Sequence, residues 1–479
     1  MEANVTELWQ IVESLHQVDS MGTDIDSLWL MLGSILVVFM QAGFAMLEVG
    51  EVSAKHTKDI LIKNLLDLAV AAMVWWSFGW GIAYGGQTET GEFNQFFGPG
   101  SFFTRGEGFA DEAGNYGTTE GYNWALWLFQ MSFSGTAVTI VSGAVGTRIS
   151  MPGYVVFAQV MGGFIYPVVV RWGWNRFGWA SPWSDSRDDL LFGCGAIDFA
   201  GTGVIHATGG MAALVMVILT GPFLDQISHS DSSRSKREEG VITQTLGAFI
   251  LWVGWYGFNG CSTLLITGSS HVAAKAMVCT TISAAAAGLG ATSASLVLYQ
   301  HVGPPELING LLSGLVAITG CCAVVEVEAA FFIGLVSAIN YLAFSRFLEL
   351  VHIDDMVDAS PVHLANGVWG MIAAGLFTSE EGYHAAYHDD RAQQCCGWLY
   401  GCGTAQLMAN VCFLVSLLGW TGFTTLLLGY FLRRVGVLRI SKIEERSGTD
   451  TATLKGTEKP HFARKILTRI ETVAAKIGY

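Results

Sequence analysis

Apolar stretches of about 20 residues recur along this chain, and they constrain its fold more than any other feature. A helix of that length spans a bilayer, and it satisfies its own backbone hydrogen bonds where no water can. The pattern predicts an all-α polytopic membrane protein with an N-terminal segment (1–27), a membrane domain (28–431) and a tail (432–479). We place eleven spans, at residues 28–50, 60–84, 122–145, 152–172, 203–222, 243–262, 272–299, 307–322, 325–344, 361–378 and 399–431.

Charge supports this class and predicts an orientation. Only 14% of the 479 residues are charged, and the net charge of −15 argues against a nucleic-acid partner. Basic residues favour the cytoplasmic side, and 11 of the 25 follow Tyr430. We therefore expect the N-terminus outside and the C-terminus inside. Residues 1–27 lack the basic start of a signal peptide, and the sequon at Asn4 would then face outward.

The nine cysteines have no metal-ligand spacing, so we expect neither a metal site nor a cofactor. Cys395, Cys396 and Cys402 lie close together in the sequence, at a predicted outer edge. One disulfide among them and isolated thiols are both open at this stage.

Two polar segments interrupt the apolar pattern and resemble each other. "DFAGTGVIHATGG" starts at Asp198, and "DASPVHLANGVWG" starts at Asp358. Each has an acid upstream of a histidine, His206 or His363, and a glycine four residues after that histidine. The segments fall in the fifth and tenth spans, so five spans followed by five spans would form an inverted repeat. Transporters with such repeats place their site near the midplane, between the halves.

Each of these polar residues also has a structural interpretation. Asp198, Asp358 and Ser360 are suited to capping helices, and Pro361 is suited to a first helical turn. A single buried histidine is usually a core residue bonded to a neighbour. Two histidines at matching places of a repeat favour a shared pore instead.

Several motifs in the same order resemble the ammonium transporter, methylammonium permease and Rhesus superfamily. The resemblance extends from about residue 28 to 456. It is carried by "QAGFAMLEVG" (41–50), "ILIKNLLD" (60–67), "FQMSFSGTAVTIVSGAVGTR" (129–148), "DFAGTGVIH" (198–206), "WVGWYGFNGCS" (252–262) and "VDASPVH" (357–363). It implies one pore per subunit, a homotrimer in the plasma membrane, and transport of ammonium and methylammonium rather than an enzymatic activity.

The resemblance also implies roles for particular residues. An outer site would recruit the cation, an aromatic gate would remove its water, and twin histidines would line the pore. Ammonium would give up a proton on entry, and ammonia would then cross. The recruitment residues are Phe129, Trp174, Ser262 and Asp198, the gate is Phe133 and Phe258, and the pore histidines are His206 and His363, with Asp358 as the second-repeat acid.

The chain departs from the family pattern in two places. Leu364 follows the second histidine where the family usually has glycine, and it adds bulk beside the pore. In the tail, "GTDTATLKG" has Thr449 and Lys455 where relatives often have Leu and His, so coupling between subunits through the tail is open. Residues 457–479 would form a basic amphipathic helix, either at the membrane surface or in solvent.

Two other functions remain open at this stage. A Rhesus-type channel would pass a neutral gas, for which the cation site at Trp174 and Ser262 has no use. An ammonium sensor with low flux would need a cytoplasmic regulator as partner, because the tail contains no output module. An intramembrane enzyme is disfavoured, since the sequence offers no nucleophile–base pair.

Overall fold

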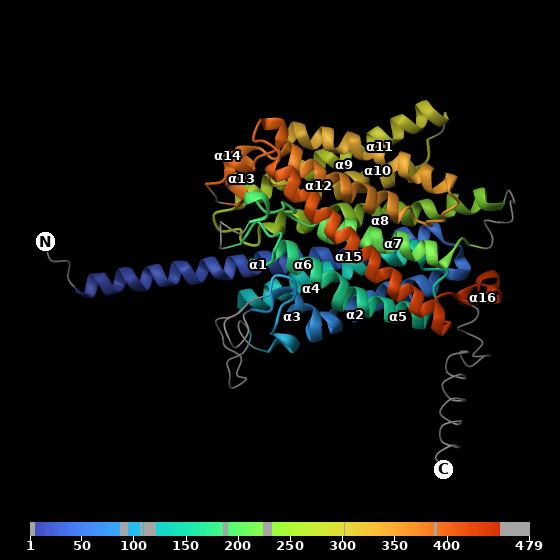
Figure 1. The fold of residues 1–479 in the computed structure, drawn as a ribbon, viewed down its shortest axis with the longest axis horizontal. Coiled ribbons are helices and arrows are strands. Elements are labelled where there is room, and N and C mark those ends of the chain that lie inside the picture. The colour runs from blue at the N-terminus through green and yellow to red at the C-terminus, as the bar shows by residue number, and fades with distance from the viewer. Residues whose placement is uncertain are drawn as a thin grey trace, which may run out of the picture.

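The computed structural model describes residues 5–86, 94–105, 109, 121–184, 190–223, 232–300, 302–387 and 390–450, with the side chains of 5–19 and 232–239 left aside. Long helices run side by side along one direction (Figure 1). Apart from two isolated β-bridges, these ranges contain no β-structure. The main helices are α1 (Val5–Glu51), α2 (Thr57–Val74), α3 (Trp80–Tyr84), α4 (Gly121–Val145), α5 (Met151–Val160), α6 (Tyr166–Trp174), α7 (Thr208–Thr220), α8 (Ser232–Gly260), α9 (Ser270–Tyr299), α10 (Pro304–Thr319), α11 (Val327–Leu350), α12 (Asn366–Phe377) and α15 (Ala405–Val435).

Shorter segments continue or connect these helices. Four segments are π-helical: η2 (Trp75–Gly79) and η4 (Met161–Ile165) each join two α-helices, and η7 (Thr202–Ala207) and η10 (Ser360–Ala365) lead into α7 and α12. Such wide turns are frequent at functional sites. The remaining short helices are α13 (Glu380–Tyr387), α14 (Ala392–Cys395), α16 (Lys442–Ser447) and the 3₁₀ turns η1 (Ala54–His56), η3 (Phe102–Thr104), η6 (Leu191–Gly193), η9 (Cys261–Thr263) and η11 (Trp398–Tyr400).

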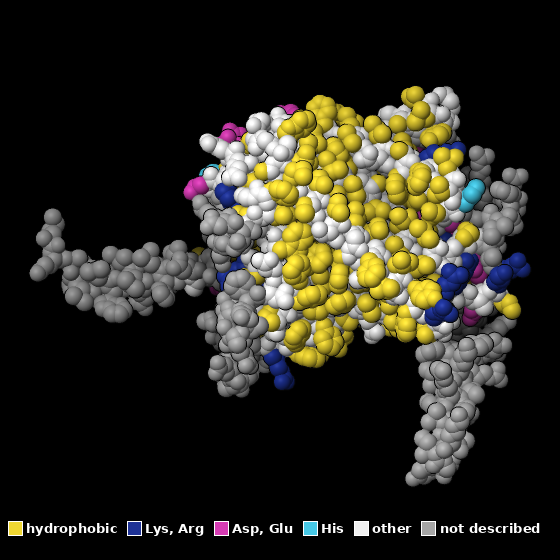
Figure 2. All heavy atoms as spheres, in the orientation of Figure 1, with side chains coloured by type: hydrophobic (Ala, Val, Ile, Leu, Met, Phe, Trp, Pro, Cys, Tyr) yellow, Lys and Arg dark blue, Asp and Glu magenta, His cyan; other side chains and the backbone are white. Residues whose placement is uncertain are grey.

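Nine helical stretches in the described part are long and apolar enough to cross a membrane. The all-helical, multi-pass membrane class predicted from the sequence is therefore confirmed. The two other predicted spans correspond to α10 and to η10 with α12, which are shorter helices packed among the nine. Figure 2 shows hydrophobic side chains in a broad band around the middle of the visible face, as a lipid-facing surface requires.

The bundle has two ends, which we call the α13 end and the α16 end after the short helices found there (Figure 1). Helix α1 extends beyond the bundle at the α13 end, whereas the last described residues lie at the α16 end. Blue Lys and Arg side chains gather mainly at the α16 end on the face in Figure 2. The asymmetry of basic charge read from the sequence is thus also an asymmetry between the two ends.

Helix α1 extends from Val5 to Glu51, so within the described residues no break separates 5–27 from the first span. The Asp26 carboxylate accepts hydrogen bonds from the backbone N–H groups of Ile266 and Thr267, at 2.7 and 2.8 Å. This contact fastens α1 to the turn between α8 and α9. The predicted boundary at residue 27 is therefore not a boundary between secondary-structure elements.

Glycines allow α1 and α8 to pack backbone to backbone. A Cβ at Gly240 would lie 1.9 Å from the Gly50 carbonyl oxygen, and one at Gly247 would lie 2.6 Å from that of Gly43. The pairing of 50 with 240 and of 43 with 247 shows that the helices are antiparallel. Small residues give membrane helices close van der Waals contact, which replaces the hydrophobic drive that lipid removes.

The start of the tail is anchored on the α16 end. Ser441 and Glu444 form a reciprocal capping box at the start of α16. The hydroxyl oxygen of Thr449, the residue found where Leu was expected, lies 3.0 Å from Nδ1 of His56. The Asp450 carboxylate accepts a hydrogen bond from the backbone N–H of Asp59 at 3.2 Å. The tail therefore contacts the turn between α1 and α2. The predicted amphipathic helix at 457–479 lies outside the described residues, as do Asn4 and Lys455.

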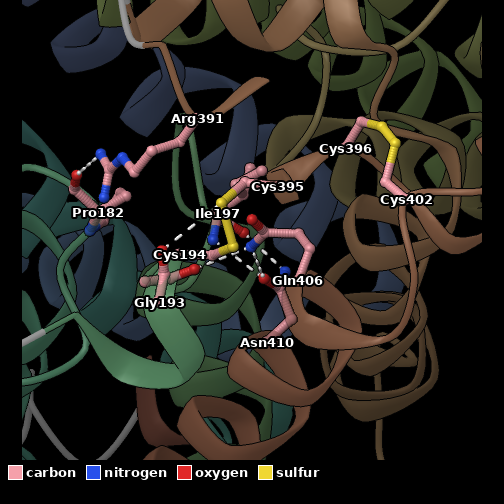
Figure 3. Close-up of a disulfide and its surroundings, with 11 residues drawn as sticks. Pro182, Gly193, Cys194, Ile197, Arg391, Cys395, Cys396, Cys402, Gln406 and Asn410 are labelled. Carbon is pink, nitrogen blue, oxygen red and sulfur yellow. Dashed lines mark hydrogen bonds between the residues drawn. A yellow bond between two sulfur atoms is a disulfide. The ribbon is translucent and has the colours of Figure 1, made fainter. Parts of the chain in front are cut away.

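Two disulfides cross-link the α13 end (Figure 3). Cys396 pairs with Cys402, and Cys395 pairs with Cys194, 201 residues away. One disulfide among the three clustered cysteines was among the open possibilities, but the participation of Cys194 was not predicted. Nearby, the Asn410 side chain donates to the Ile197 carbonyl at 2.9 Å and accepts from its N–H at 3.0 Å. These contacts fix the chain just before Asp198.

Candidate functional site

Aromatic rings form a continuous column through the middle of the bundle. The Phe133 ring contacts three others, with centroid distances of 4.6 Å to Phe129, 4.5 Å to Phe258 and 5.9 Å to Trp174. Phe129, Phe133 and Phe258 are at most 1% exposed, whereas Trp174 is partly exposed. The predicted recruitment and gate aromatics therefore meet, although they come from α4, α6 and α8.

Ser262 lies in η9, the 3₁₀ turn that follows α8, one turn after Phe258. Its hydroxyl donates to the Phe258 carbonyl at 2.7 Å, which leaves the hydroxyl lone pairs available as acceptors. The next residue, Thr263, accepts from the indole N–H of Trp29 at 3.0 Å. The partly exposed Ser262 thus belongs to a polar rim above the buried gate rings.

The two histidine rings meet edge to edge, in nearly parallel planes, beneath the gate. Their ring centroids are 5.2 Å apart, and the two Nδ1 atoms lie 3.2 Å apart, so one of them must carry the shared proton. His206 also lies nearly parallel to Trp255 and Phe258, with ring centroids at 5.1 Å and 5.5 Å. The column continues from the gate through His206 to His363, and Phe44 lies 6.3 Å beyond His363. Trp255 and Phe44 were not among the predicted site residues.

Asp198 caps the π-helical turn that carries His206. One carboxylate oxygen accepts from the N–H groups of Gly203 and Val204 at 3.0 and 2.7 Å, and the other accepts from Gly201 at 3.1 Å. The capping interpretation is therefore confirmed in geometry. The Asp198 carbonyl also accepts the indole N–H of Trp174 at 2.7 Å. The same short segment thus orients both the outer tryptophan and the first histidine.

The two polar segments contact each other reciprocally. A Cβ at Gly210 would lie 2.4 Å from the backbone nitrogen of Leu364, and one at Gly367 would lie 2.7 Å from that of Ala207. Both glycines therefore let the helices cross at the residue next to each histidine, which accounts for the shared His-x-x-x-Gly spacing. Leu364 takes part in this crossing through its backbone.

The hydrogen bonds correct the predicted pairing of the two acids. Asp355, eight residues before His363, accepts from the N–H groups of Ala359 and Ser360 at 3.1 and 2.7 Å. Asp198 lies eight residues before His206 and makes the same kind of cap, so Asp355 is its counterpart. Burial raises the pKa of Asp355, although the bonds from Ser360 and Ala359 oppose this rise. The cap of this turn is thus Asp355, and Ser360 contributes its N–H.

Asp358 occupies a different position in the second segment. Its backbone is left-handed (φ 56°), as is that of Gly201 (φ 106°), three residues after the other acid. The Asp358 carboxylate accepts from Tyr341 and Ser345 of α11, at 3.1 and 3.0 Å. The sequence motif aligned the wrong aspartate because it matched the acids and not their distance from the histidine.

A cavity begins where the histidine column ends. It lies toward the α16 end and is lined by Phe44, Leu47, Glu48, Glu51, Thr139, Ile140, Gly143, Gln244, Pro305, Ile308, Asn309, Leu312, Val357, Ala359, Val362 and His363. The two ends of the column therefore differ: rings close the end toward Trp174, and a partly polar cavity adjoins the other. Within the described ranges, no three His, Cys, Asp or Glu side chains are placed to hold a metal ion.

Comparisons with known proteins agree on one family. The model of the Ammonium Transporter Family matches residues 28–459. Ammonium transporter 1 member 3 of Solanum lycopersicum is 32% identical over 448 residues, covering 91% of this chain and 93% of its own length. Ammonium transporter Amt2 of Archaeoglobus fulgidus is 34% identical over 441 residues, covering 91% and 89%. A solved structure named Sensor Amt Protein superposes with a TM-score of 0.76 at 28% identity, covering 91% and 99%. Since the family model spans nearly the whole chain and the relatives align over most of their lengths, the chain belongs to the ammonium transporter family.

Proposed function

We propose that this protein moves ammonium and methylammonium across the plasma membrane by dehydrating the cation, removing a proton and passing the neutral amine. The observation that carries the proposal is the unbroken series of ring contacts from Trp174 through the phenylalanine gate to the paired histidines. An apolar channel of this kind favours a neutral amine over any ion.

The outer end is suited to a small cation. A tryptophan face attracts a cation by about 1–2 kcal/mol when the ion is partly dehydrated. Ser262 supplies an acceptor for the N–H groups of the ion, and Phe129 supplies a second ring. A bound ammonium would thus exchange water for rings and a hydroxyl before the gate. Asp198 lies in the segment that holds Trp174, and its negative charge favours a cation there.

The histidines provide a route for a proton as well as for ammonia. Each imidazole has one nitrogen in the shared Nδ1–Nδ1 contact and one elsewhere, and Nε2 of His206 is buried without a partner in the described part. An amine in the pore can therefore hydrogen-bond to this nitrogen. Potassium cannot lose a proton and would remain a buried charge, so deprotonation is also the basis of selectivity. The pair titrates as one unit, because each proton affects both rings.

The proposed topology has eleven spans, with α10 and η10–α12 completing the nine, arranged as an inverted 5+5 repeat. The crossing at Gly210 and Gly367 supports the repeat. The disulfides at the α13 end support an oxidising exterior on that side, and the basic α16 end fits the cytoplasm. The N-terminus is then outside and the tail inside. We propose three subunits per assembly, each with its own pore.

A sensor function is the second candidate, because the solved structure named Sensor Amt Protein resembles this chain over most of its length. The tail contact between Thr449 and His56 supports a route by which a cytoplasmic regulator would act. A Rhesus-type gas channel is disfavoured by Trp174 and Ser262, since a neutral gas has no use for a cation site.

Ammonium-evoked current in oocytes that express the chain tests the proposal. We expect saturable inward current with ammonium and methylammonium and little with potassium. Trp174→Leu removes the π face and is expected to raise the half-saturating ammonium concentration about tenfold. Wild-type affinity and selectivity in that variant would disprove the recruitment site, and uptake of neutral ammonia without current would favour the gas channel.

A further inference from the structure

The cavity beyond His363 contains an intramembrane acid that the proposed pathway does not use. Glu48 lies on α1 and is 2% exposed. It lines the same cavity as His363, on the side of the column opposite Asp198. An ionisable side chain inside a membrane bundle generally marks an ion or proton pathway, because burying it without a role is costly.

The contacts of Glu48 hold its carboxylate in place as a hydrogen-bond acceptor. Oε1 accepts from the Ser142 hydroxyl at 2.7 Å, and Oε2 accepts from the Asn64 amide at 3.0 Å. Both donors are neutral, and Glu48 takes part in no ion pair in the part of the chain that the structure describes. Each carboxylate oxygen can accept a further hydrogen bond. Glu48 is thus held in place by two neutral donors, can accept further hydrogen bonds, and has no ion-pair partner among the described residues.

The basic side chain near Glu48, that of Lys63, is bonded to other groups. Lys63 pairs with Asp59 at 2.7 Å and donates to the Ile149 carbonyl at 3.1 Å. Asp67 faces Glu48 from α2, but Thr139 and Tyr154 donate to it. Other titratable groups facing Glu48 are Tyr154 on α5 and, around the cavity, Glu51 and His363. The acids Glu48, Asp59 and Asp67 thus outnumber the one base, Lys63, beside the Glu48 carboxylate, which favours a cation there.

The wall beside Glu48 is kept open by a glycine. A Cβ at Gly143 would lie 2.7 Å from Val357 Cγ2 and 3.5 Å from Glu48 Oε1. Gln244 donates to the other cavity acid, Glu51, at 2.7 Å, so Glu51 already has a partner. Of the two acids, Glu48 is therefore the one better placed to receive a ligand.

We infer that Glu48 is a second binding site for a small protonated amine, at the inner end of the pathway. Ammonia that leaves His363 takes a proton from water of the inner compartment, and the Glu48 carboxylate binds the ammonium formed until it leaves. The step is NH₃ + H₃O⁺ → NH₄⁺ + H₂O, with no net change of charge. This inference rests on the proposed function, and it gives the protein one cation site on each side of the neutral segment.

The test compares the two faces of the membrane. Outward current in excised inside-out patches is measured while ammonium on the inner face is varied, and inward current is measured in whole oocytes. Glu48→Gln is expected to raise the inner half-saturating concentration at least fivefold and to change the outer one less than twofold. Trp174→Leu is expected to show the reverse pattern. Glu51→Gln is the matched control, with both values within twofold of wild type.

Glu48→Asp keeps the carboxyl group but shortens the side chain by one methylene. We therefore expect the half-saturating ammonium concentration on the inner face to be about threefold above that of wild type. If Glu48→Gln is absent from the surface, this variant carries the test alone. The inner site would be overturned by an unchanged half-saturating concentration on the inner face in the variant tested. Equal shifts of the half-saturating concentration on both faces would overturn it as well. A wild-type chain without ammonium current would instead refute the proposed function.

Discussion

The two π-helical segments that carry the histidines share a backbone plan but differ in what surrounds it. In each, an aspartate eight residues before the histidine caps the turn, and a left-handed residue follows the aspartate. In the first segment that residue is Gly201, and a Cβ there would lie 3.0 Å from the Trp174 ring. In the second it is Asp358, whose carboxylate binds α11.

This difference gives the two segments different neighbours. The missing side chain at Gly201 lets the indole approach and bond to Asp198, so the first segment orients the tryptophan of the proposed outer cation site. The side chain at Asp358 instead anchors the second segment to Tyr341 and Ser345 of α11. The two segments thus share their capping pattern around the histidines and differ in the neighbours that each one contacts.

The largest expected effect separates the two capping acids. Asp198→Ala should abolish ammonium current, because it removes both the cap and the charge near the outer site. Asp198→Asn keeps the shape and removes the charge, and we expect at least a tenfold loss of maximal current. Asp355→Asn should lose less than threefold at equal surface expression. Full activity in Asp198→Asn would show that capping alone explains this acid.

The next effect concerns selectivity in the histidine pair. His206→Glu places a charge between Trp255 and His363 and should admit water, so potassium current should rise at least tenfold relative to ammonium current. His206→Ala should mainly slow ammonium. His363→Glu should have a smaller effect, because His363 adjoins the cavity and is 5% exposed. Currents in ammonium and in potassium are measured for each variant. Fully selective, wild-type currents throughout would make these histidines ordinary core residues.

A third effect tests the left-handed positions. Gly201→Ala adds a Cβ at φ 106°, 2.7 Å from Ile205 Cδ1 and 3.0 Å from the Trp174 ring. Displacing the indole should raise the half-saturating ammonium concentration about fivefold. The measurement is a concentration series of inward current. An unchanged half-saturating concentration would mean that Trp174 tolerates displacement. The contrast between Gly201 and Asp358 would then have no functional consequence.

The smallest expected effect is at the matching position in the second segment. Asp358→Asn keeps most hydrogen bonds to Tyr341 and Ser345, so half-saturation should stay within twofold of wild type. We expect only a small loss of thermal stability, on the order of 1 kcal/mol, from weaker hydrogen bonds to a neutral acceptor. Thermal unfolding in detergent would detect it. A large loss of affinity here would show that both segments contribute equally to the cation site.

The sequence alone was sufficient for everything that depends on local pattern. Apolar length predicted the helices, and the motifs around Asp198, His206 and His363 predicted the family, because span length and motif spacing are properties of short segments. The aromatic site residues came only from the resemblance, since the chain has 28 Phe and 16 Trp and composition singles out none.

Tertiary structure decided what depends on contacts between distant segments. The Cys194–Cys395 pair joins residues 201 apart. The eight-residue spacing of Asp355 from His363 is in the sequence, but only the hydrogen bonds from Ala359 and Ser360 show that this acid, and not Asp358, caps the turn. Glu48 lies among apolar residues of α1, and only the packing of α2, α4 and η10 around it shows two neutral donors and a cavity. The periodicity of a sequence describes one helix at a time. A site forms where several helices meet, so its geometry depends on how those helices pack.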